Sequence, residues 1–217
     1  MELSEKKAVN ATNKVKTIKV MALKNRNRVS EVVDIHMQSF TGFFLTFLGR
    51  GFLTQMYKGY IEHEASGLIV AVSSNNKIIG FVAFSNDLSG FYKLLVKKHL
   101  LQFVWYAFLG FLKKPKVFFR LLRALSYSDD AKKEEKYIEL SSIGVLPSQE
   151  GGGVGSKLIT ALKKTADWNT YAYIKLETDA IDNEYANKFY QANGFVLECQ
   201  YETREGRKMN EYRFYLR

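Results

Sequence analysis

The chain has 217 residues, 47% of them hydrophobic, and a formal net charge of +10. This length and composition indicate one folded domain with a core of its own and exclude a chain that stays disordered. A single cysteine, Cys199, excludes an intramolecular disulfide, and we expect it to be a small buried residue of a strand. The basic charge attracts polyanions, but no helix-turn-helix, zinc or aromatic RNA-binding signature accompanies it, so we expect no nucleic-acid partner.

The first 14 residues are polar and lack an apolar run, which predicts a frayed extension and no secretory signal. We therefore expect a cytoplasmic protein whose single domain covers residues 15–217. Hydrophobic periodicity then predicts a strand, a helix, an aromatic loop with a second helix, and two strands joined in a hairpin. These elements occupy residues 17–23, 29–40, 41–62, 67–73 and 77–85.

Residues 87–130 predict a helical insertion between the third and fourth strands. From Lys93 to Arg123 there are eight Lys or Arg residues and no Asp or Glu, and Pro115 divides the stretch into two helices. The longest apolar run, residues 100–112, is too short to span a membrane, which takes about 20 residues. Three alternatives remain for the insertion: a hairpin packed on the sheet or on a second subunit of a homodimer, a lid over a substrate pocket, or a peripheral contact of residues 93–123 with a membrane surface.

The last third of the chain alternates between strand and helix patterns. We expect a strand, a helix, a strand, a helix capped at Asn193–Gly194, and a final hairpin. These elements occupy residues 137–145, 153–168, 171–178, 183–192, 195–202 and 209–216.

A glycine-rich bend separates the strand that ends at Val145 from the helix behind it. Pro147 ends the strand because it has no N–H to donate, and the glycines of residues 151–155 let the backbone turn tightly. Free N–H groups at the start of a helix bind anions, so we expect a phosphate-containing ligand here. The spacing matches neither a P-loop nor a dinucleotide-binding Gly-x-Gly-x-x-Gly motif.

Two segments resemble the GNAT family (Gcn5-related N-acetyltransferases). The family's pyrophosphate loop reads Val-x-Pro-x-x-Arg/Gln-Gly-x-Gly-x-Gly/Ala, and residues 145–155 follow it except at Glu150, where the family has Arg or Gln. The family's later signature, Asn-x-x-Ala-x-x-Phe-Tyr-x-x-x-Gly-Phe, matches residues 183–195 throughout. Both motifs stand in the expected order, and the resemblance covers about residues 16–86 and 136–217.

This resemblance implies a fold and a co-substrate. The fold is of the α/β (α+β) class, with a mixed, mostly antiparallel central sheet flanked by helices, and its fourth and fifth strands splay apart around the acyl thioester. The co-substrate is acetyl-CoA, and no metal is expected. By resemblance, Ile143 and Val145 contact the pantetheine arm and Asn183 contacts the cofactor from the following helix. The residues expected to hold the pyrophosphate are Gly151, Gly153, Gly155 and Ser156, and the carboxylate of Glu150 should weaken that contact.

The resemblance also indicates two catalytic residues. Tyr190 falls at the position of the general acid that protonates the coenzyme A sulfur. Glu139 is our candidate base for removing the proton of an attacking amine, and Glu177 on the neighbouring strand is a rival. The three histidines of the chain form no visible cluster, so we do not expect them to bind a metal.

The sequence therefore predicts an enzyme that transfers an acetyl group from acetyl-CoA to a primary amine of a small acceptor. The basic, aromatic insertion favours an amino sugar, including one linked to a nucleotide, and the aromatic segment 40–60 should form part of the acceptor wall. A protein N-terminus or lysine is an alternative acceptor. A non-catalytic acyl-CoA-binding module at a membrane surface is an alternative of a different class.

Overall fold

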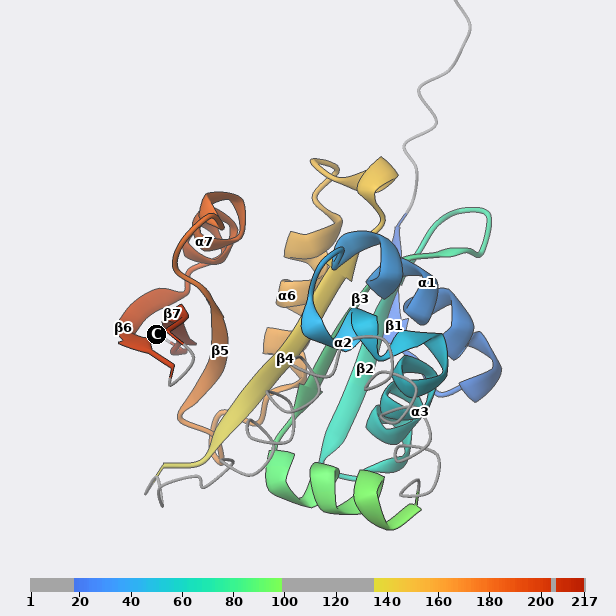
Figure 1. Ribbon diagram of the computed structural model, residues 1–217, viewed down its shortest axis with the longest axis horizontal. Coiled ribbons are helices and arrows are strands. Elements are labelled where there is room, and N and C mark those ends of the chain that lie inside the picture. The colour runs from blue at the N-terminus through green and yellow to red at the C-terminus, as the bar shows by residue number, and fades with distance from the viewer. Residues whose placement is uncertain (1–17, 99–134, 204–205, 217) are drawn as a thin grey trace, which may run out of the picture.

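A single mixed sheet runs through the molecule, and a computed structural model describes it over residues 18–98, 135–203 and 206–216. The sheet has seven strands in the order β1-β2-β3-β4-β5-β7-β6 (Figure 1). Neighbouring strands are antiparallel except β4 and β5, which run parallel. The strands are β1 (Lys19–Ala22), β2 (Ser66–Val72), β3 (Ile78–Ser85), β4 (Tyr137–Val145), β5 (Tyr173–Asp179), β6 (Val196–Glu202) and β7 (Lys208–Phe214). The predicted mixed, mostly antiparallel sheet is confirmed.

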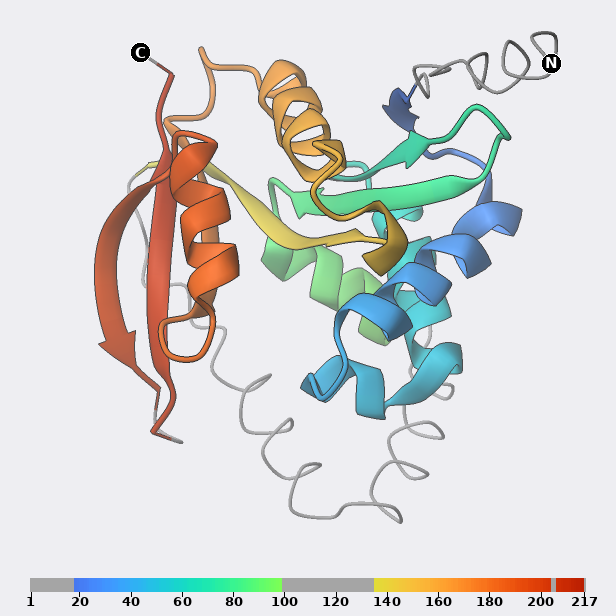
Figure 2. The same cartoon turned by 90° about the horizontal axis from the view of Figure 1, so that it is seen from above.

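Helices cover both faces of this sheet (Figure 2). One face carries α1 (Val29–Ser39), α2 (Phe44–Phe47) and α3 (Gly49–Glu62), preceded by the short helix η2 (Arg26–Arg28). The other face carries α6 (Val154–Thr165) and α7 (Glu184–Ala192), with the short helix η3 (Pro147–Gln149) leading into α6. Each face has a buried apolar cluster, the first centred on residues such as Val33, Leu53 and Phe81 and the second on Leu158, Leu162 and Ile174.

Two irregularities of β4 shape the middle of the sheet. The register with β3 shifts after the pair Ser142–Ala83, so that Ser141 is an extra residue, a β-bulge. The parallel pairing with β5 covers three residue pairs, from Tyr137–Tyr173 to Glu139–Lys175. Beyond this last pair, β4 continues after Glu139 and β5 after Lys175 without pairing to each other, and their ribbons diverge in Figure 1. The splayed pair of strands expected from the family resemblance is therefore present.

The first part of the predicted insertion is helical. Residues 88–98 form a helix, and its Phe91 and Leu95 are buried against α3, where a Cβ on Gly59 would collide with the Leu95 side chain. The remainder of the predicted helical hairpin, and most of the basic segment 93–123, lies outside the described residues. Within the part of the chain that the structure describes, no helix has the length and apolar character needed to cross a membrane.

The expectation that Cys199 is buried is wrong. Cys199 is exposed, as are all residues of β6, because β6 is the outermost strand of the sheet. The apolar character of this segment predicts a strand, but it does not reveal that the strand lies at an edge.

Candidate active site

The opening between β4 and β5 leaves main-chain groups of β4 without a neighbouring strand. The N–H of Leu146 donates to the carbonyl of Ile79 at 2.9 Å, so Leu146 faces β3. Main-chain groups of successive residues point to alternate edges of a strand, and Ile143 and Val145 therefore face away from β3, toward the opening. An extended ligand in the opening can hydrogen-bond to them as an added strand would.

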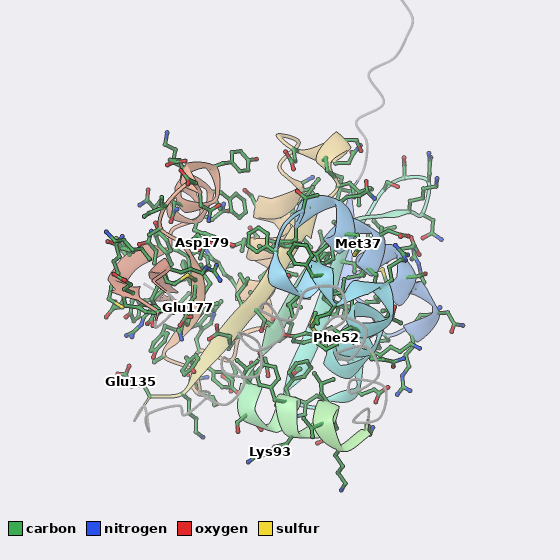
Figure 3. All side chains as sticks on the ribbon, in the orientation of Figure 1. Met37, Phe52, Lys93, Glu135, Glu177 and Asp179 are labelled. Atoms are coloured by element: carbon green, nitrogen blue, oxygen red, sulfur yellow. The ribbon has the colours of Figure 1, made fainter. Side chains whose placement is uncertain are left out.

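The opening is bordered on one side by α1. The hydroxyl of Ser39, the last residue of α1, donates to the carbonyl of Val145 at 2.8 Å. In Figure 3 the labelled Met37 of α1 lies on one side of β4, and Glu177 and Asp179 of β5 lie on the other. In this view α1 and β5 thus lie on opposite sides of β4.

The glycine loop turns where β4 leads into α6. Gly151 and Gly153 have φ values of 73° and 71°, in the left-handed region that favours glycine, and a Cβ on either would meet nothing within 4 Å. The first-turn amides of α6, on Val154, Gly155 and Ser156, precede the first bond of the helix and have no acceptor among the described residues. Together with the positive end of the helix dipole, they form a site for a phosphate group.

Gly155 serves a different purpose from the other loop glycines. A Cβ at this position would lie 2.9 Å from the Phe189 ring, so its absence lets α7 approach the first turn of α6 closely. This contact places the helix that carries Tyr190 next to the glycine loop. Glu150, just before the glycines, is exposed.

The ring of Tyr190 is buried between Phe189, Phe195 and Tyr212. Fully buried side-chain polar atoms without a partner occur, within the described ranges, at His36 and Asn86, and the Tyr190 hydroxyl is not one of them. The hydroxyl of Tyr190 has no hydrogen-bond partner among the described residues. Burial raises the pKa of Tyr190 to about 12, so the hydroxyl stays protonated at neutral pH, as a proton donor must.

Asn183 joins the end of β5 to the start of α7. Its side-chain amide donates to the Thr178 hydroxyl at 2.6 Å and to the Asp179 carbonyl at 3.2 Å, and Asn187 donates to the Asn183 carbonyl at 2.8 Å. The amide nitrogen is thus occupied within the protein. Asn183 can therefore contact a cofactor through its side-chain oxygen.

Glu139 lies at the closed end of the opening, in the last residue pair that joins β4 to β5. Its side chain is 12% exposed, and a carboxylate oxygen lies 3.8 Å from the Lys175 ammonium. Lys175 also contacts the rival base Glu177 at 2.6 Å, and Glu211 of β7 at 3.7 Å. Burial lowers the pKa of Lys175, but the three carboxylates together raise it above the ordinary lysine value, so Lys175 is a cation.

Most of the predicted site residues thus lie along one opening, with Glu139 at its closed end, Ile143 and Val145 along it, and the glycine loop at its far end, beside the helix that carries Tyr190. Sequence reasoning missed Lys175 and Ser39. The signal for Lys175 is a lysine between the buried residues Ile174 and Leu176, which needs a charged partner once buried. No sequence signal distinguishes Ser39, whose partner is 106 residues away.

Comparison with known proteins agrees with this geometry. A sequence model of the acetyltransferase (GNAT) family matches residues 30–195, which is more than half of the chain. The chain therefore belongs to the GNAT family of acetyltransferases, whose reaction is acetyl transfer from acetyl-CoA. A comparison with curated protein sequences found no match.

Solved structures share the fold at low sequence identity. The N-acetyltransferase from Staphylococcus aureus Mu50 is 14% identical, with a TM-score of 0.59 over 93% of this chain and 99% of that one. The ribosomal-protein-S18-alanine N-acetyltransferase from Escherichia coli is 14% identical, with a TM-score of 0.54 over 92% of this chain and 94% of that one. At these identities the likeness establishes the fold alone.

Proposed function

We propose that this chain transfers the acetyl group of acetyl-CoA to a primary amine of a small acceptor. The observation that carries the proposal is the divergence of β4 from β5 directly before the glycine loop. The main-chain groups of Ile143 and Val145 that face the opening suit the amide-bearing pantetheine arm, although the Val145 carbonyl already accepts from Ser39, and the first-turn amides of α6 suit the pyrophosphate. The end of β4 leads directly through the glycine loop into α6, so one extended ligand can contact both groups of main-chain atoms.

The residues of the opening supply what acyl transfer needs. Glu139 accepts the proton of the amine, which then attacks the thioester carbon, and a C–N bond forms. The main-chain amide of Ile143 is a donor for the oxyanion of the tetrahedral intermediate. When the C–S bond breaks, Tyr190 donates its proton to the departing sulfur.

We propose an amino sugar as the acceptor. The support is the aromatic segment 40–60, which we expect to form part of the acceptor wall: Phe43, just before α2, and Phe47, its last residue, are 47% and 41% exposed. Exposed aromatic rings stack on the apolar faces of sugar rings. The basic composition of residues 93–123 adds support for a nucleotide-linked sugar, whose diphosphate is anionic.

An acceptor screen tests the function. Purified full-length protein is mixed with acetyl-CoA and, in separate reactions, free amino sugars, nucleotide-linked amino sugars, peptides with a free N-terminus, and lysine peptides, and release of free thiol is measured. We expect thiol release with an amino sugar and its loss in Tyr190→Phe. Turnover confined to peptides would replace the amino sugar by the alternative acceptor.

The exposed carboxylate of Glu150 favours a second candidate, a non-catalytic acyl-CoA-binding module at a membrane surface, because it weakens the pyrophosphate contact. This candidate predicts acyl-CoA binding without turnover on any amine, together with co-sedimentation with anionic vesicles that salt abolishes. Turnover without vesicle binding would exclude it.

A further inference from the structure

Each of the two serines at the β4 bulge is contacted by a buried tyrosine of α3. The Tyr57 hydroxyl hydrogen-bonds with Ser142, and the Tyr60 hydroxyl hydrogen-bonds with Ser141. Tyr57 is 0% exposed and Tyr60 4% exposed, and they are one helical turn apart, which places both hydroxyls on one face of α3. Two consecutive bulge residues are thus held from the same helix.

A buried histidine also holds one of these tyrosines. His36 of α1 is 3% exposed, and its Nδ1 lies 2.7 Å from the Tyr57 hydroxyl, while its Nε2 is buried and has no partner. Burial lowers the pKa of His36 to about 4, so the imidazole is neutral at pH 7. A proton on Nδ1 avoids a buried N–H without an acceptor at Nε2. In this tautomer His36 donates to the Tyr57 oxygen, so Tyr57 is held both by His36 and by Ser142.

The bulge needs such support because the pairing of β4 with β3 is interrupted there. Ser141 has no counterpart on β3, so the ladder of cross-strand hydrogen bonds is interrupted there. The next residue but one is Ile143, whose main chain faces the opening. A shift of Ser141 and Ser142 would move the Ile143 amide relative to anything bound between β4 and β5.

We propose that Tyr57 and Tyr60 are positioning residues for acetyl transfer, which hold the β4 bulge so that the Ile143 amide meets the thioester carbonyl, with His36 orienting Tyr57. This inference rests on the proposed function, since it concerns how the same site treats acetyl-CoA. A displacement of about 1 Å at a reacting group lowers rates by about a hundredfold, so these buried hydroxyls contribute to rate without touching the substrate.

The carbonyl stretch of bound acetyl-CoA, labelled with 13C at the acetyl carbonyl, reports this effect directly. An amide that donates to the carbonyl lowers its stretching frequency below the value in water. We expect a lowered frequency in the wild-type protein and a return toward the solution value in Tyr57→Phe and Tyr60→Phe. The affinity for coenzyme A should stay within about twofold in both variants, because the glycine loop is untouched.

Tyr173→Phe is the matched control. Tyr173 is a tyrosine of β5 that is 1% exposed and lies at the closed end of the opening, away from the bulge. Its variant removes the hydroxyl of a tyrosine whose ring is buried, and we expect the wild-type frequency. Ser142→Ala, combined with Tyr57→Phe, completes a double-mutant cycle in which the second substitution should add little to the first.

The outcomes are distinct. A wild-type frequency in both tyrosine variants, or the same change in Tyr173→Phe, would overturn the positioning role while leaving the proposed function intact. Additive effects of Tyr57→Phe and Ser142→Ala would also overturn it. Failure of the wild-type protein to bind acetyl-CoA would overturn the proposed function and this inference with it.

Discussion

Tyr190 combines a buried ring with a hydroxyl that bonds no described residue, so substitution of this side chain tests the proposed chemistry directly. We predict that Tyr190→Phe lowers kcat by about a hundredfold or more, the usual contribution of a general acid. The dissociation constant for acetyl-CoA should change little, because the ring keeps its contacts with Phe189, Phe195 and Tyr212. Steady-state kinetics measures the change in kcat, and calorimetry of the same preparation measures the dissociation constant. A parallel loss of binding would show that Tyr190 only supports the fold.

His36 should make the stability of the protein depend on pH. Its pKa falls from 6.5 to about 4 on burial, so the unfolded state binds more protons than the folded state between these values. Stability therefore falls as the pH drops from 6.5 to about 4, with His36 contributing on the order of 3 kcal/mol over this window.

Urea unfolding of the wild-type protein and of His36→Gln at several pH values measures this contribution. Other groups titrate in the same range, so the difference between the two proteins is the informative quantity. We expect the free energies of unfolding to converge as the pH is lowered. Parallel curves would contradict the proposed state of His36.

The turn into α6 depends on glycines with left-handed backbone conformations. We predict that Gly153→Ala costs about 1–2 kcal/mol of stability through backbone strain and weakens acetyl-CoA binding about tenfold, because the new Cβ enters the space reserved for the pyrophosphate. Gly206→Ala is the matched control, since Gly206 has a φ of 79° in the β6–β7 turn, where a Cβ would meet only ordinary contacts. It should lose similar stability and keep its affinity. Equal affinities for the two variants would argue against the loop as the phosphate site.

Three strands of the sheet meet at the Lys175 ammonium, which contacts Glu139 of β4, Glu177 of β5 and Glu211 of β7. We predict that Lys175→Met lowers the free energy of unfolding by about 3–5 kcal/mol, because the largely buried carboxylates of Glu139 and Glu211 lose a neighbouring cation. Lys188→Met, at an exposed position of α7, should change it by less than about 0.5 kcal/mol. Because folding raises the pKa of Lys175, the wild-type contribution is present below the ordinary lysine pKa of about 10 and is lost as the pH rises above it. Denaturant titrations of both variants provide the comparison, and similar losses would contradict a role of Lys175 in joining the strands.

Elements with a local signal could be predicted from the sequence. The bounds of β4 agree with the alternating pattern of residues 137–145 and the following proline, and the helix after the glycines agrees with its apolar stripe. The bulge at Ser141 could not be predicted, because it depends on which residues of β3 pair with β4. The meeting of Lys175 with carboxylates from three strands requires the sheet order, which local patterns do not contain.

At the scale of the whole molecule, the order and pairing of the strands create the opening that forms the site. β5 pairs with β4 over three residue pairs and with β7 over six. The C-terminal strands β5, β6 and β7 therefore diverge from β4 and the strands before it. The motifs predicted the loop and the helix on either side of the resulting opening. They could not predict its support by Ser39, Tyr57 and Tyr60, which come from helices far away in sequence.

Calorimetric titration of the full-length protein with acetyl-CoA, with coenzyme A alongside, is the most direct measurement of whether the opening and the glycine loop form one co-substrate site. We predict binding of both ligands in the range of about 1–100 µM, and weaker binding by Gly153→Ala. Absence of binding at millimolar acetyl-CoA would show that the opening between β4 and β5 does not hold this co-substrate, and the proposed function would be wrong.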